Sequence, residues 1–155
     1  MNKKSAGLLL YRFKDKSFEF FLVHPGGPFW KNKDAGSWSI PKGEFNEDED
    51  ALKAAKREFR EETGMKPPSG KFIALTPRKQ KSGKLVFAWA VEADLSAEDI
   101  KSDLFEMEWP PRSGKKQQFP EIDRAAWFDL KEAKSKILPG QLAFLEELLQ
   151  LLTAK

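Results

Sequence analysis

The 155-residue sequence contains no cysteine and only one histidine, His24. Without thiols the chain can form neither a disulfide nor a thiolate metal site, and it has no cysteine nucleophile. A single histidine excludes a zinc site built from several histidines and disfavours a serine–histidine triad. We therefore expect His24, which precedes Pro25, to have a structural role.

Long hydrophobic runs are absent as well. No stretch approaches the roughly 18 apolar residues of a membrane-spanning helix. Leu8–Leu10 follow two lysines but are too few for the apolar region of a signal peptide, because Arg12 ends the run. With 40% hydrophobic and 33% charged residues, the composition is typical of globular proteins. We expect one domain over residues 1–155, cytoplasmic, with no membrane partner, as a monomer or homodimer.

The net charge of +3 hides an uneven distribution. Residues 43–65 hold eight acids and four bases, a balance of −4, which leaves +7 for the remaining residues. An acidic segment on a basic protein suits a polyanionic substrate that meets a cation bound by the acids. A solvated acidic helix on a slightly basic protein has the same charge pattern, so charge alone does not decide.

Periodicity predicts an α/β chain. Two β-type runs, 6–13 and 18–24, flank the polar turn 14–16 and predict a hairpin. The other expected strands are 72–76, 85–93 and 125–128, with a short extended segment at 38–43; the expected helices are 48–63, 130–137 and 141–152. Residues 95–120 are expected to form a long irregular loop. The last helix has an apolar stripe that we expect to pack in the core, formed by Leu142, Leu145, Leu148, Leu149 and Leu152. Strands interleaved with helices favour a mixed sheet covered on both faces.

The helix at 48–63 is framed by terminal signals. Asn46 with Glu49 three residues later predicts an N-cap with a reciprocating acid, and Gly64 is a natural C-terminal cap. At 100° per residue, an arc of about 100° contains only three charged side chains. They are Glu58, Glu61 and Glu62.

This arc has two interpretations. Like charges at spacings of three and four residues cost a few tenths of a kcal/mol each when unpaired, and a solvated acidic face tolerates that cost. Alternatively, carboxylates from adjacent helical turns converge on a hard divalent cation such as Mg²⁺. Arg57, four residues before Glu61, can pair with that carboxylate and orient it.

The whole segment from Gly43 to Met65 favours the metal site. It reads Gly-x5-Glu-x7-Arg-Glu-Phe-x-Glu-Glu-x-Gly-Met. Ordinary residue frequencies give a chance match at one start position with a probability on the order of 10⁻⁹. The pattern is that of the Nudix box, and the sequence resembles the Nudix hydrolases. Residues 125–133, Ala-Ala-Trp-Phe-Asp-Leu-Lys-Glu-Ala, also resemble members of that family.

The resemblance implies a fold and a reaction. It implies an α/β/α sandwich with a mixed β-sheet, and Mg²⁺, with Mn²⁺ as the alternative, bound by Glu58, Glu61, Glu62 and the carbonyl of Gly43. It implies hydrolysis of a nucleoside diphosphate linked to another group, with Glu61 or Glu62 as the base and Arg57 orienting it. In some relatives the base lies on a late loop, which adds Glu106, Glu108 and Glu121 as candidates.

Residues outside the carboxylate arc are candidates for substrate contacts. Lys42 is either a phosphate contact or an exposed turn lysine. Trp38, Trp109 and Phe45 are candidates for stacking on a base, although each also suits the core. The stretch from Glu108 to Arg112 is a candidate substrate-facing loop, with Arg112 as a phosphate contact.

The substrate itself is not defined by the sequence. ADP-ribose-cleaving relatives carry a proline about fifteen residues past the box, where this chain has Gln80 and Lys81. Diadenosine-polyphosphate relatives carry a tyrosine slightly further on, whereas the single tyrosine here is Tyr11. We expect a nucleoside or dinucleoside polyphosphate. The alternatives are an enzyme for capped or triphosphorylated RNA ends, and a nucleotide-binding regulator without turnover.

Overall fold

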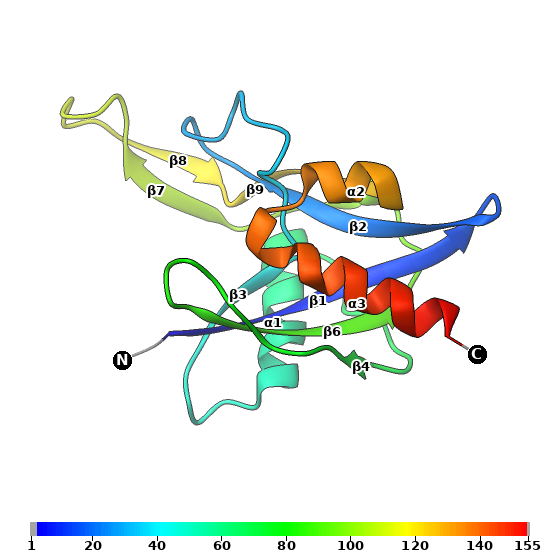
Figure 1. Cartoon of the computed structure of the whole chain (residues 1–155). Coiled ribbons are helices and arrows are strands. Elements are labelled where there is room, and N and C mark those ends of the chain that lie inside the picture. Colours follow the sequence, from blue (N-terminus) through cyan, green and yellow to red (C-terminus); the bar gives the residue numbers. More distant parts are fainter. Residues whose placement is uncertain (1–2, 155) are drawn as a thin grey trace.

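The computed structural model describes residues 3–154, which form nine strands and three α-helices (Figure 1). The strands are β1 Lys4–Lys14, β2 Ser17–Pro25, β3 Lys42–Phe45, β4 Ile73–Ala74, β5 Arg78–Lys79, β6 Leu85–Glu92, β7 Leu104–Glu108, β8 Lys116–Pro120 and β9 Ile122–Asp129. The helices are α1 Ala51–Thr63, α2 Leu130–Lys136 and α3 Leu142–Thr153, and the 3₁₀ turns are η1 Ala97–Asp99 and η2 Pro139–Gln141.

The strands β1 and β2 form the predicted hairpin. Asp15 and Lys16 both have positive φ, 52° and 69°, which is the geometry of a tight two-residue hairpin turn. Alternate side chains of β1 face opposite sides of the sheet. Leu9 packs in one core cluster, whereas Leu8 and Leu10 pack in the other.

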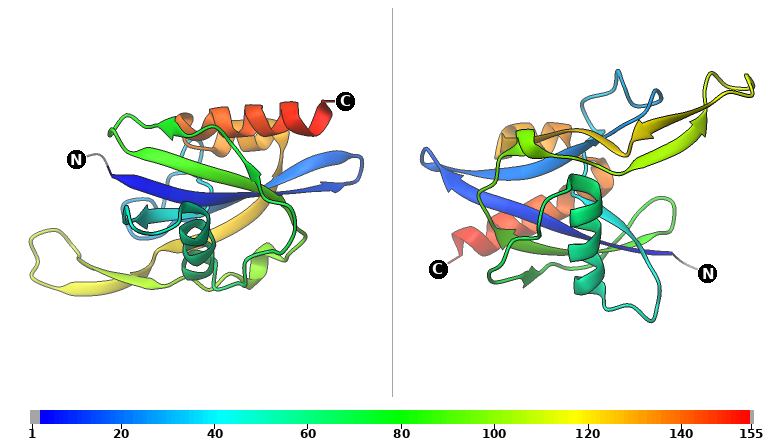
Figure 2. Two further views of the ribbon diagram at one scale, coloured as in Figure 1. Left: turned by 90° about the horizontal axis from the view of Figure 1, so that it is seen from below. Right: turned by 180° about the vertical axis from the view of Figure 1, so that it is seen from behind.

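The main sheet is mixed and has helices on both faces. Its strand order is β4-β6-β1-β2-β9, with β3 also pairing β1 and β5 pairing β6. The pair β1–β6 is parallel and the other pairs are antiparallel. Figure 2 shows α1 on one side of the sheet and α2 and α3 on the other. The expected α/β/α sandwich is confirmed.

Each face of the sheet has its own core. Ala54, Ala55 and Phe59 of α1 pack in one cluster, and Phe144 and Leu145 of α3 pack in the other. Of the predicted leucine stripe, Leu145 and Leu148 are buried, Leu142 and Leu152 are partly buried against the same cluster, and Leu149 is half-buried.

Two predictions about elements were wrong. The helix α1 begins at Ala51 rather than at residue 48, because the Asp50 side chain accepts a hydrogen bond from the Lys53 amide and so provides the cap. Asn46 instead closes a preceding turn through its carbonyl, which accepts from the Glu49 amide. Residues 95–120 are not an irregular loop, since β7 and β8 form a separate two-stranded hairpin there.

The β7–β8 hairpin extends away from the sandwich (Figures 1 and 2). At its base, Gly26 donates its amide to the Glu121 carbonyl, and a Cβ on Gly27 would lie 2.9 Å from the Phe105 ring. The segment after β2 therefore packs beside the hairpin. Within residues 3–154, the helices are all too short or too polar to cross a membrane.

Candidate active site

The carboxylates of α1 are positioned by the packing of the helix. Because Ala54, Ala55 and Phe59 are fully buried against the sheet, the helix cannot rotate, and the adjacent arc is directed toward β3. Glu58 is held largely out of water, with 13% of its side chain exposed, whereas Glu61 is 42% exposed.

Arg57 links the acids of this segment. Its Nε and Nη2 donate to the two oxygens of Glu49 at 2.9 and 3.1 Å. Its Nη1 donates to Glu58 Oε1 at 2.8 Å and lies 3.3 Å from Glu61 Oε2. Such charge-assisted, partly bidentate contacts fix the guanidinium plane. Glu49 was expected to cap or brace the helix. It does not provide the cap, but it accepts two hydrogen bonds from Arg57 of the helix.

Gly43 lies directly against Glu58. A Cβ built on Gly43 would be 2.1 Å from the Glu58 carboxyl carbon, so only glycine allows the carboxylate and the β3 backbone to approach this closely. Gly43 lies within β3 and is not among the glycines of positive φ. A glycine can be required by a positive φ or by the close approach of another group. At Gly43 the requirement is therefore the close approach of Glu58.

Glu62 lies deeper in the site, beside Lys42. The Lys42 amide donates to Glu62 Oε1 at 3.1 Å. Burial raises the pKa of Glu62 to about 8, since neither this amide nor the Lys42 charge compensates for lost solvent. Burial also raises the pKa of Glu58 despite Arg57, and burial followed by repulsion from Lys84 lowers the pKa of Lys42.

The site fits a hard divalent cation in its chemistry. It offers carboxylate oxygens and a strand backbone beside them, and the charges of Arg57 and Lys42 do not fully offset the burial of Glu58 and Glu62. Among residues 3–154, however, no three His, Cys, Asp or Glu side chains are grouped closely enough to form a ready metal site. Glu58 and Glu61 contact Arg57, and Glu62 contacts the Lys42 amide, so a cation bound by all three requires at least one of these side chains to change rotamer.

A pocket of about 220 Å³ opens beside Glu62 and Lys42. Its walls include Trp30, which lies in the segment after β2, and Glu121, which lies between β8 and β9. The pKa of Glu121 is raised by burial and by its acidic neighbours Asp103 and Glu61. Sequence reasoning missed Trp30, although the Pro-Gly-Gly-Pro turn just before it marks a loop of the kind that binding residues occupy.

Several candidate residues lie elsewhere. Trp38 is only 4% exposed and packs edge-on against His24 and Phe128, so it lies in the core, which was one of the two roles expected for it. Buried His24 contacts Asp123 and the Lys33 carbonyl, in agreement with a structural role.

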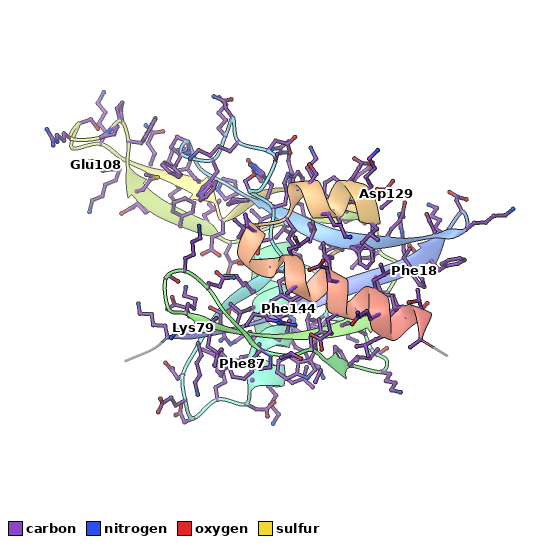
Figure 3. All side chains as sticks on the ribbon, viewed as in Figure 1. Phe18, Lys79, Phe87, Glu108, Asp129 and Phe144 are labelled. Atoms are coloured by element: carbon purple, nitrogen blue, oxygen red, sulfur yellow. The ribbon has the colours of Figure 1, made fainter. Side chains whose placement is uncertain are left out.

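The residues of the expected substrate-facing loop are also remote from α1. Figure 3 shows Glu108 near the outer end of the β7–β8 hairpin, and Trp109 and Arg112 follow it in the turn. Glu106, on β7, faces solvent. The structure therefore does not bring these four residues to the carboxylates. Phe45 packs edge-on against Phe87 and is only half-buried.

Comparisons with known proteins agree with this geometry. A family model described as the NUDIX domain matches residues 1–148. An Ap4A hydrolase of C. elegans in a binary complex is similar in structure, with a TM-score of 0.64 and 22% identity, over 99% of each chain. The NUDIX domain of Shewanella oneidensis NrtR, complexed with ADP ribose, has a TM-score of 0.65 and 17% identity, over 99% of this chain and 90% of that one. No curated protein matches in sequence. At these identities the solved structures establish the fold alone.

Proposed function

The chain belongs to the Nudix hydrolase family, and on that basis we propose that it is a divalent-cation-dependent pyrophosphohydrolase. The proposed substrate is a nucleoside diphosphate linked to a further group, in the first place a nucleoside or dinucleoside polyphosphate. The proposed cation is Mg²⁺, with Mn²⁺ as the alternative. The observation that carries the proposal is the arc of Glu58, Glu61 and Glu62 beside Gly43.

The proposed roles follow from the contacts of each residue. A bound divalent cation neutralises the diphosphate and lowers the pKa of water. Glu58, Glu61, Glu62 and the Gly43 carbonyl would hold it, while Arg57 positions Glu58 and Glu61. Lys42 lines the pocket of about 220 Å³ that also contains Trp30, called the Trp30 pocket below. Its positive charge would contact a phosphate oxygen of the substrate there.

The Trp30 pocket suits the nucleoside part of the substrate. Its lining includes Glu62, which is also part of the carboxylate arc. The lining also includes the apolar side chains of Val23, Ile122 and Leu138. Pockets that combine apolar walls with a few converging polar groups are typical small-molecule sites. A volume of about 220 Å³ suits one base rather than two, so a second nucleoside would extend into solvent.

The general base remains a choice among three glutamates. Glu61 and Glu62 are the candidates on α1, and Glu121 is the late-loop candidate that lies in the pocket with Glu62. A Gln substitution of a metal ligand should weaken the affinity for Mg²⁺. A Gln substitution of a base should lower kcat by roughly 10²–10⁴-fold at saturating Mg²⁺ and leave the metal affinity unchanged. Metal titrations of kcat for the three variants separate the two roles.

The test of the proposed function is Glu61→Gln against Glu146→Gln. Both substitutions remove one helical carboxylate, but Glu146 lies on α3 across the sheet. We expect Glu61→Gln to lower Mg²⁺-dependent phosphate release by at least a hundredfold with an unchanged thermal midpoint, and Glu146→Gln to retain wild-type turnover. Equal turnover in the two variants would remove Glu61 from the mechanism.

A second candidate function is hydrolysis at a 5′ end of RNA, which the net positive charge outside residues 43–65 favours. A capped or triphosphorylated oligomer offered beside small nucleotides distinguishes the two substrates. If no nucleotide, NDP-sugar or RNA end is turned over while nucleotides bind, the chain is a nucleotide-binding module instead.

A further inference from the structure

The outward face of α1 and the loop after it have four basic side chains without acidic partners. They are Lys53, Lys56, Arg60 and Lys66. Within residues 3–154, no carboxylate lies within 4.0 Å of the charged nitrogens of these four. Arg57, on the same helix, contacts three glutamates. The basic face is therefore a local excess of positive charge beside the acidic arc.

The four side chains border a shared, open hollow. The hollow has a volume of about 620 Å³. Its lining includes all four, together with Arg57 and Phe72, and contains no acidic residue. The Lys56 ammonium lies 4.6 Å from the centre of the Phe72 ring, so an aromatic surface forms part of the wall.

The arrangement suits a ligand with several phosphates in a row. Lys56 and Arg60 are four residues apart, as are Lys53 and Arg57, and like charges at this spacing destabilise a helix by a few tenths of a kcal/mol per pair. A bound polyanion would relieve this repulsion. From Lys53 to Arg60 the helix rises about 10 Å, which is longer than one phosphate group.

We propose that this hollow binds the phosphodiester backbone of single-stranded nucleic acid. Positive grooves with an aromatic surface are how proteins bind single strands without reading the sequence. Phe72, Pro67 and Pro68 form an apolar part of the lining, which can contact the bases of a strand but has no counterpart in inorganic polyphosphate or in a lipid headgroup. Because Arg57 lines the hollow and also contacts Glu58 and Glu61, a bound strand lies next to the carboxylates.

The test measures binding separately from catalysis. A single-stranded RNA oligomer with a 5′-hydroxyl and a 3′ fluorophore is titrated with the full chain in EDTA, and its anisotropy is followed at several salt concentrations; a DNA oligomer of the same sequence is the second arm. The variant is the pair Lys53→Gln and Arg60→Gln, which leaves the contact between Lys56 and Phe72 intact. The control is the pair Lys131→Gln and Lys134→Gln, exposed cations of α2 on the other side of the sheet.

We expect the α1 pair to weaken RNA binding at least tenfold at low salt, and the α2 pair to stay within about twofold of wild type. The slope of log affinity against log salt should decrease by about 1.4 for two lost phosphate contacts. Equal weakening by both pairs would show a general effect of net charge and overturn the proposal. So would tighter binding to anionic vesicles or to inorganic polyphosphate than to RNA, or no salt-dependent binding by wild type.

The outcomes for this surface and for the catalytic site are independent. The oligomer has no pyrophosphate bond, so binding does not require turnover. Lys53 and Arg60 lie outside the carboxylate site, so the α1 pair should hydrolyse small nucleotides at the wild-type rate. Binding without hydrolysis of any nucleotide would contradict the proposed function alone.

Discussion

At the scale of single residues, the absence of a side chain at Gly43 shapes the site as much as the glutamates do. The Glu58 carboxylate occupies the space that a Cβ on Gly43 would need, and Arg57 holds it there. The motif in the sequence correctly predicted which residue types meet. It could not show that Glu58 is the acid pressed against Gly43, because that contact depends on how α1 packs on the sheet.

The substitution Gly43→Ala tests this contact. The three atoms nearest the new methyl group belong to the end of the flexible Glu58 side chain, which can move aside, so we expect a change in unfolding free energy below about 1.5 kcal/mol. We expect the concentration of Mg²⁺ needed for half-maximal activity to rise at least tenfold, because the displaced carboxylate no longer faces the β3 backbone.

Gly140→Ala is the control for that experiment, since its Cβ would make only ordinary contacts of 3.7 Å or more. Metal titrations of activity and denaturant unfolding of both variants give the two quantities. If Gly43→Ala kept the wild-type metal requirement, close approach between Gly43 and Glu58 would have no part in the site.

Asp34 illustrates a charge that matters for stability rather than chemistry. It accepts hydrogen bonds from Lys136 and from Trp38 Nε1, which lower its pKa below the ordinary value. A carboxyl group with a lowered folded-state pKa adds stability above its unfolded pKa of about 3.9 and loses that contribution as the pH falls through the folded pKa.

We therefore expect Asp34→Asn to be less stable than wild type at pH 6 and to approach wild-type stability near pH 3. Urea unfolding at several pH values measures the difference. Because Asp34 joins the segment after β2 to α2, the substitution should also loosen the segment that includes Trp30. A stability difference that stays constant from pH 6 to pH 3 would contradict the assignment.

At the scale of elements, the sequence predicted most strands and helices but placed one boundary and one loop wrongly. Asn46 and Glu49 have the spacing of a capping box, yet Asp50 provides the cap. Asn46 and Asp50 are both possible cap residues four positions apart, and the local sequence does not show which of them lies at the end of the helix that packs on the sheet through Ala54, Ala55 and Phe59. The β7–β8 hairpin was missed because β8, Lys116–Pro120, has few β-branched or apolar residues, and the short alternation of β7 therefore had no recognisable partner strand.

Substituting the two competing cap residues tests the helix boundary. We expect Asp50→Ala to lower the unfolding free energy by about 1 kcal/mol, since the Lys53 amide loses its acceptor. Asn46→Ala should change it by less than about 0.5 kcal/mol, because an exposed residue outside the helix contributes little. Thermal or urea unfolding measures both free energies. A larger loss of stability for Asn46→Ala than for Asp50→Ala would show that Asn46 caps the helix, as the sequence predicted.

At the scale of the whole molecule, the sandwich joins parts of the chain that no local pattern connects. The hydrophobic periods predicted the two core faces, and the family resemblance predicted the layers. The pocket beside the carboxylates combines Trp30, Lys42, Glu62 and Glu121, which come from four separate segments. No spacing in the sequence relates Trp30 or Glu121 to the segment that holds Lys42 and Glu62, so Trp30 was not foreseen and Glu121 could not be distinguished from Glu106 or Glu108.

The uneven distribution of charge along the sequence is also explained by the arrangement of the whole molecule. The acidic segment predicted from the sequence is divided by α1 into an arc of carboxylates and a separate basic hollow, with Arg57 between them. One helix therefore presents a carboxylate face, for which we propose cation binding, and a basic face, for which we propose anion binding. The positive charge outside the segment adds a general attraction for polyanionic substrates.

The central claim is that the carboxylate arc of α1 makes the chain a metal-dependent hydrolase of nucleotide pyrophosphate bonds. The most direct measurement is hydrolysis of a panel of nucleoside triphosphates, dinucleoside polyphosphates, ADP-ribose and NDP-sugars in ¹⁸O-water, with Mg²⁺ or with EDTA, and mass spectrometry of the products. We predict ¹⁸O in one phosphate product of at least one substrate with Mg²⁺, and none with EDTA. Equal ¹⁸O incorporation in EDTA, or no product from any member of the panel, would contradict the claim.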